Sequence, residues 1–250
     1  MSDNPTPLTR LYSRAVVRLS PTDESENVGE FLQGLVTNDV AGPLPVYAAL
    51  LSAQGKTMFD FLVWPAEEGQ MLIDCEAQAA DGLVKRLSLY RLRRKISIER
   101  DENLGVYWRI NGADGAPDPR HPALGGRRIA KICDTDTPAD ADWTAHRLSL
   151  GIPEGSAELN DILWLETNAV ELNGVSFDKG CYIGQENTAR MNWRQKVNRR
   201  LVVVPLDQSQ EKRRKHDHAE LNLAVDHLRV SDLDAANLPE WQASALSPAD

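Results

Sequence analysis

The sequence predicts an α+β protein in which helices pack on one side of a largely antiparallel sheet. Residues 46–52 and 57–64 are two β-rich runs joined by a short Gly-containing turn, which indicates a hairpin. Apolar residues at helical spacing form stripes before and after this hairpin. The 250 residues can bury a core in one large domain or in two to three small ones.

The elements of the first half follow from these patterns. Residues 14–20 read as a strand, and the apolar stripe over 28–36 predicts an amphipathic helix. A further strand is expected at 70–75. The stripe over 80–90 predicts a long helix, and a strand resumes at 96–99.

The second half is less regular. The Gly- and Pro-rich stretch 111–126 predicts a linker, followed by a short strand, a helical patch around 143–150 and a strand at 199–206. The charged stretch 207–219 is expected to be exposed and mobile. The expected domains are residues 1–110, residues 111–198 with the second α+β part, and residues 199–250 with a short C-terminal β segment and tail.

Composition excludes several classes of function. The net charge of −9 would repel nucleic acid and anionic membrane, and no run approaches the roughly 18 apolar residues of a membrane span. We therefore expect no direct nucleic-acid or membrane partner, and a monomer. The first ten residues have no apolar signal core, and the three cysteines form no C-x-x-C, so a reducing cytoplasmic location is expected. Apart from His216 and His218 the five histidines show no metal-binding spacing, and no metal site is expected.

The stretch "VSFDKGCYIGQEN", residues 175–187, is the strongest candidate site. Its first residues read as a strand and residues 185–191 can form a helix, which would place Cys181 at a strand-to-helix turn framed by two glycines. Free backbone N–H groups and Lys179 would favour the thiolate there. From the residues alone, a small buried hydrophobic side chain is an equally good reading of Cys181.

The segment "KGCYIGQE" resembles the signature of the YgfZ group of folate-binding proteins, relatives of the glycine-cleavage T protein. Stretches 31–40, 50–63 and 147–155 agree with that pattern in order and spacing, so the resemblance covers roughly residues 12–205. It implies the folate-binding aminomethyltransferase fold with a reduced C-terminal β-barrel-like segment, and tetrahydrofolate or another reduced folate as a non-covalent cofactor. It also implies iron–sulfur cluster assembly or repair in client enzymes such as radical-SAM proteins, and a link to tRNA modification.

One departure leaves the activity open. At the stretch that matches residues 57–64, the pattern of the T protein resembles a paired Asp-Asp. This chain has Phe59 and Asp60 there and so keeps one carboxylate, which argues against aminomethyl transfer. A folate-dependent aminomethyltransferase and a non-catalytic adaptor with the same fold are the two alternatives to a folate-binding assembly factor. The sequence does not decide whether the protein turns over a substrate.

The resemblance and the residue chemistry together select the candidate residues. Asp60 is the sole polar side chain of its strand and needs a partner, which an arginine could also supply structurally. Glu166 could accept adjacent pterin N–H groups or be a solvated surface residue. An arginine could pair with the folate glutamate tail, and Tyr182 could stack on the ligand or fill core. The catalytic candidates are Cys181 and Lys179, and the cofactor-binding candidates are Asn38, Asp60, Glu166, Tyr182, Gly184, Gln185, Glu186 and Arg190.

Overall fold

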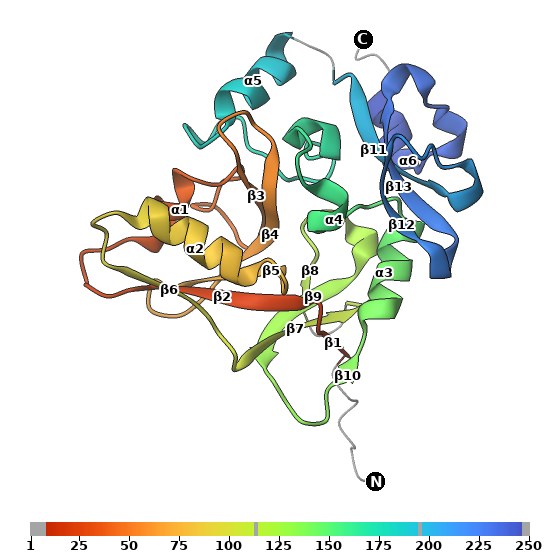
Figure 1. Ribbon diagram of the computed structural model, residues 1–250. Coiled ribbons are helices and arrows are strands. Elements are labelled where there is room, and N and C mark those ends of the chain that lie inside the picture. Colours follow the sequence, from red (N-terminus) through yellow and green to blue (C-terminus); the bar gives the residue numbers. More distant parts are fainter. Residues whose placement is uncertain (1–8, 113–114, 195–196, 247–250) are drawn as a thin grey trace.

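The computed structural model describes residues 9–112, 115–194 and 197–246. Their strands form three sheets, two of five strands and one of three (Figure 1). The mixture of helices and largely antiparallel sheets is the α+β class that the sequence predicts.

The first sheet is built from the N-terminal hairpin and its neighbours, all antiparallel. Alternating side chains divide its core: one face packs against the helices α1 (Val28–Gln33) and α2 (Ala80–Arg91), and the other faces the second sheet. Asn27 caps α1 by accepting the Glu30 N–H. In spatial order the strands are β3 (Val46–Leu51), β4 (Thr57–Pro65), β5 (Met71–Glu76), β2 (Arg14–Pro21) and β6 (Ile96–Arg100).

The second sheet joins strands from both sides of residue 110, so the expected domain boundary there falls inside one sheet. The stretch 111–126 is not a linker: it contains a strand and the 3-10 helix η1 (Pro122–Leu124), and it pairs with the strand that follows. Its glycines allow the close backbone approach of residues 112 and 126. The strands, in spatial order, are β10 (Thr137–Pro138), β1 (Thr9–Leu11), β7 (Leu104–Arg109), β9 (Gly126–Lys131) and β8 (Ala116–Pro117).

Between these two sheets lies a core rich in tryptophan, with Trp108, Trp143 and Trp164 all buried. Trp143 comes from α3 (Asp140–Ser149), which confirms the helix expected near 143–150. Trp164 comes from the 3-10 helix η2 (Trp164–Thr167), which follows α4 (Ser156–Leu159).

The third sheet begins at residue 199 and has the order β11 (Arg199–Pro205), β13 (Leu223–Arg229) and β12 (Arg214–His218). The expectation of a mobile tail at 207–219 is wrong for its second half, because β12 pairs with β13 there. Lys215 and His218 of β12 also form hydrogen bonds with the carbonyl of Asn160 and the carboxylate of Glu158, at the end of α4. The remaining short helices are α5 (Gln185–Arg194), η3 (Leu206–Gln208), η4 (Ala219–Leu221), η5 (Val230–Asp232), η6 (Ala235–Asn237), α6 (Glu240–Ala243) and η7 (Ser244–Leu246).

Candidate functional site

The loop around Cys181 carries an exposed thiol. Residues 175–184 form an irregular loop and not the expected strand, whereas α5 does begin at Gln185 as expected. Gly180 and Gly184 have φ angles of 93° and 83°, in the left-handed region that favours glycine. The two glycines therefore set the path of the loop, and the thiol projects from it into solvent.

One side of this loop packs against the turn of the β3–β4 hairpin. A Cβ on Gly184 would lie 2.6 Å from the carbonyl oxygen of Ser52, too close for any side chain. Asn187 donates from Nδ2 to the carbonyl of Gln54 at 2.9 Å, which ties the first turn of α5 to the same hairpin. The segment 50–63 and the cysteine segment are thus in direct contact.

The other side of the loop is tied to the end of α1. Lys179 donates from Nζ to the carbonyls of Gln33, at 2.7 Å, and Val36. Burial lowers the pKa of Lys179 to about 8, and the nearby carboxylate of Asp39 only partly offsets this. The ammonium also lies 5.1 Å from the centre of the Tyr182 ring. Lys179 therefore clamps the loop onto the segment 31–40, and its described contacts do not include the thiol.

Tyr182 and Asn38 make contacts that hold the fold together. Tyr182 is buried in the core between the sheets. Asn38 donates from Nδ2 to the carbonyls of Tyr47 and Asn173, at 2.8 and 2.7 Å, and so fixes the chain that leaves α1.

The expected ligand residues of α5 lie at its N-terminal half. Gln185 donates from Nε2 to the carbonyl of Gly180 at 3.0 Å and closes the cysteine loop. Glu186 and Arg190 form a 3.6 Å ion pair across one helical turn, and both side chains are mostly exposed. Such surface pairs contribute little to stability.

Asp60 is buried in the middle of β4 and accepts a 3.3 Å hydrogen bond from the hydroxyl of Tyr47. Burial raises the pKa of Asp60 to about 6, and the negative charges of Glu154 and Glu76 add to this. The positive charges of Arg14 and Arg120 lower the pKa of Asp60, but their effect is smaller than that of burial. The carboxyl group can therefore exchange a proton near neutral pH.

Beside Asp60 lies a buried network of charged side chains that the sequence analysis did not select. One signal was available, because Asp74 interrupts the otherwise apolar run of β5. Its members are three arginines and three carboxylates: Arg14, Arg120, Arg127, Asp74, Asp118 and Glu154.

The network is tightly bonded. Asp74 accepts from Arg14 at 2.6 Å and from Arg127 at 2.7 Å, which joins β5 to the second sheet. Glu154 accepts from Arg120 at 2.5 Å, and the surrounding arginines hold its pKa well below the usual range despite burial. Arg127 also lies 4.3 Å over the ring of Trp143. Each charge of the network thus has at least one partner of opposite charge.

Glu166 is buried, which rules out the reading of a solvated surface residue. Its Oε2 lies 2.9 Å from Nε2 of His227 on β13. The carboxylate expected to bind a pterin is thus in contact with the third sheet.

Two hollows in the described part of the chain are candidates for a folate site, and their size and lining residues can be compared with the ligand residues expected from the sequence. A wide hollow of about 760 Å³ is lined by Met58, Phe59 and the loops around Gln54 and Asn160. It adjoins a cavity of about 10 Å³, room for one water, that borders Asp60. Glu166, Tyr182 and Arg190 line neither of these two hollows.

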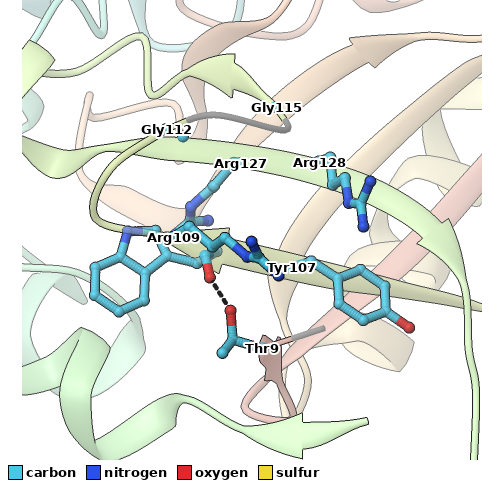
Figure 2. Close-up of a pocket in the computed structure, with 9 residues that line it drawn as sticks. Thr9, Tyr107, Arg109, Gly112, Gly115, Arg127 and Arg128 are labelled. Carbon is cyan, nitrogen blue, oxygen red and sulfur yellow. Dashed lines mark hydrogen bonds between the residues drawn. The ribbon is translucent and has the colours of Figure 1, made fainter. Parts of the chain in front are cut away.

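Figure 2 shows another small cavity, between β7 and β9, with Arg109, Arg127 and Arg128 around it. Its volume of about 10 Å³ admits a single water, and Thr9 closes one side by donating to the carbonyl of Trp108. Over the described ranges no three His, Cys, Asp or Glu side chains are placed to hold a metal ion. Within the same ranges no helix has the length and apolarity to cross a membrane.

The arrangement of sheets defines a known class of fold. The crystal structure of glycine cleavage system aminomethyltransferase T from Bartonella henselae matches with a TM-score of 0.63, covering 90% of this chain and 78% of that one. Only 10% of the aligned residues are identical, so the match concerns the fold alone. The chain has the aminomethyltransferase fold that the sequence predicts.

Proteins that are similar to this chain in sequence give more specific information than the match of fold. The iron–sulfur cluster assembly factor IBA57 of Mus musculus is 33% identical over 79% of this chain and 66% of its own length, and that of Homo sapiens 31% identical over 78% and 65%. The Neurospora crassa homologue is 32% identical over 78% of this chain and 52% of its own length. The chain thus spans between about half and two thirds of these relatives. No protein-family model matches the chain.

These relatives are named as mitochondrial proteins, which contradicts the cytoplasmic location expected from the sequence. The expectation rested on the missing apolar signal core, which argues only against secretion, and on cysteine usage, which indicates a reducing setting without distinguishing one reducing compartment from another.

Proposed function

We propose that this protein takes part in iron–sulfur cluster assembly and that the Cys181 thiol is its reactive group. The observation that carries the proposal is an exposed thiol on a loop that Lys179 and Gly184 hold between α1 and the β3–β4 hairpin. The names of the relatives supply the context of cluster assembly.

The chemistry limits what one thiol can do. On losing its proton Cys181 can bind one iron, but clusters are generally held by four protein ligands. The remaining ligands must come from a client or another assembly protein. Cys181 is therefore a transient ligand, and radical-SAM enzymes are one class of client to test.

The test uses a matched pair of cysteine variants. Cys181→Ala should abolish rescue of a cluster-dependent enzyme in cells that lack this protein, while its melting temperature stays near that of the wild type. Cys133→Ala removes another exposed thiol outside the loop and should rescue fully. Full rescue by a stable Cys181→Ala protein would overturn the proposal.

Binding of a reduced folate is a second candidate. The fold favours it, and the 760 Å³ hollow beside Phe59 has the size of a small-molecule site. Titration calorimetry with tetrahydrofolate should give saturable heat, and Phe59→Ala should weaken binding about tenfold by removing an aromatic face. Glu166→Ala should also weaken tetrahydrofolate binding if the ligand occupies the pocket expected from the sequence, in which Glu166 binds the pterin. No heat at saturating tetrahydrofolate would exclude this candidate.

Aminomethyl transfer is not part of the proposal. The resemblance places Phe59 where the T protein has one carboxylate of its pair, and Asp60 is buried next to Phe59. Turnover of a lipoyl-bound aminomethyl substrate at a T-protein rate would restore that alternative. An adaptor without a ligand would show neither folate binding nor dependence on Cys181.

A further inference from the structure

The C-terminal end of α2 is a cationic surface on an acidic protein. Residues 85–95 contain six Lys and Arg and no Asp or Glu, although the whole chain carries −9. Three of the six are tied to the protein itself: Arg91 to the carbonyl of Ile96, Arg94 to Glu26 and Lys95 to Asp23. The other three have no ion pair among the contacts that the structure describes, and these are Lys85, Arg86 and Arg93.

Two leucines stand among these cations. Leu89 is 62% exposed and Leu92 is 85% exposed, whereas Leu83 and Leu87 of the same helix are buried in the core. Lys85 and Arg86 precede Leu89 by four and three residues, so they share its face of the helix. Leu92 ends the helix with a positive φ of 51°, which is costly for leucine. This strained leucine contributes little to the core.

We propose that this surface, the α2 patch of Lys85, Arg86, Leu89, Leu92 and Arg93, docks the protein reversibly on an anionic phospholipid bilayer. The leucines would enter between the headgroups, and the cations would pair with lipid phosphates. The proposal departs from the expectation of no membrane partner, because that expectation rested on the net charge of the whole chain and not on its distribution over the surface. It is independent of the role of Cys181.

Position and shape favour lipid over a protein partner. α2 lies on the outer side of the first sheet, at the edge of the molecule (Figure 1). A bilayer accepts protruding leucines without a matching pocket, whereas a protein partner must supply one. Repulsion by the distant acidic surface is screened beyond about 8 Å at physiological salt.

The acidic groups nearest the patch do not cancel its charge. Asp23 and Glu26 are paired with Lys95 and Arg94, and Glu30 lies 4.0 Å from Arg94. Glu24 is exposed in the same segment, and Asp81 is exposed on α2 one turn before Lys85, so both oppose the proposal locally. The three unpaired cations outnumber these two carboxylates.

The test is co-sedimentation of the full chain with vesicles. Vesicles of phosphatidylcholine with 30% phosphatidylserine should bind the protein at about 0.1 M salt, and pure phosphatidylcholine vesicles should not. Arg86→Gln with Arg93→Gln should reduce partitioning about 25-fold, near fivefold for each cation. Leu89→Ala with Leu92→Ala should reduce it about tenfold, because the smaller side chains bury less apolar area.

Two matched variants control for general charge and hydrophobicity. Lys212→Gln removes an exposed cation far along the chain, and Leu221→Ala removes a leucine that is 37% exposed; neither should change binding. Every variant should keep the wild-type melting temperature, since all the changed side chains are on the surface.

Three results would overturn the proposal. Absence of sedimentation with the anionic vesicles is one, and equal binding to both kinds of vesicle is another. The third is full binding by the leucine variant together with complete competition by poly-glutamate. That result would mark the α2 patch as an electrostatic site for an acidic protein partner.

Discussion

At the scale of single residues, Asp60 shows how burial changes the chemistry of a carboxyl group. Its neighbours include both arginines and carboxylates, yet desolvation is the largest influence and its pKa is raised to about 6. The hydroxyl of Tyr47 supplies one hydrogen bond, which is less than an ionised carboxylate can accept. Asp60 is therefore poorly solvated in its charged form.

Asp60→Asn should stabilise the protein above pH 7. Because the pKa of Asp60 is higher folded than unfolded, the unfolded chain binds fewer protons between about pH 4 and pH 6. The free energy of unfolding therefore falls as the pH rises through that window. The variant lacks this loss and should be more stable by about 1–3 kcal/mol at pH 7.5, with the difference vanishing near pH 4.

Urea unfolding at several pH values measures this difference. Asp178→Asn, at an exposed carboxylate of the cysteine loop, is the control and should leave the pH profile unchanged. A variant less stable than the wild type at pH 7.5 would show that the charged form of Asp60 is favoured.

At the scale of elements, the position of the cysteine loop depends on a contact between two short segments. Gly55 and Gly184 meet where the β3–β4 turn touches the loop, and both have positive φ angles. The two sides of this contact are over 120 residues apart in sequence. The position of Cys181 is thus set by packing between elements as well as by its own turn.

Gly184→Ala should destabilise the protein more than Gly180→Ala. Both positions have positive φ, so each alanine pays a similar conformational cost of about 1 kcal/mol. At 184 the new Cβ would also meet the Ser52 carbonyl at 2.6 Å, whereas nothing lies within 4 Å at 180. We expect a further loss of about 1–3 kcal/mol at 184, measured by urea unfolding. Equal losses would show that the hairpin contact is loose.

At the scale of the whole molecule, the buried charge network joins the sheets. Arg14 and Asp74 belong to the first sheet, Arg127 to the second, and Glu154 to the loop between α3 and α4. Each charge costs desolvation energy on burial, and the geometry of several hydrogen bonds repays it. The network therefore holds only if all its members are in place.

Glu154→Gln should destabilise the whole protein by about 3–5 kcal/mol, because it leaves buried arginines without their counter-charge. Glu186→Gln, at a side chain that is 90% exposed, is the matched control and should change stability little. Thermal unfolding followed by tryptophan fluorescence measures both. A loss below 1 kcal/mol for Glu154→Gln would mean that the arginines have alternative partners.

Local patterns in the sequence determined much of this protein. The β3–β4 hairpin, α2, α3 and β11 lie where spacing and composition predict them, because each pattern reflects burial of one face of one element. The resemblance carried by "KGCYIGQE" also predicted the fold. The helix after Cys181 followed from its composition.

Only the tertiary structure decided what those residues meet. Arg14 pairs with Asp74 and Glu154 across 60 or more residues of sequence, and Glu166 faces His227 on another sheet. The segment 111–126 has the composition of a linker but becomes ordered because its backbone pairs with β9. Periodicity describes which face of an element is buried, but the partner of a buried charge depends on how sheets and loops close together in space.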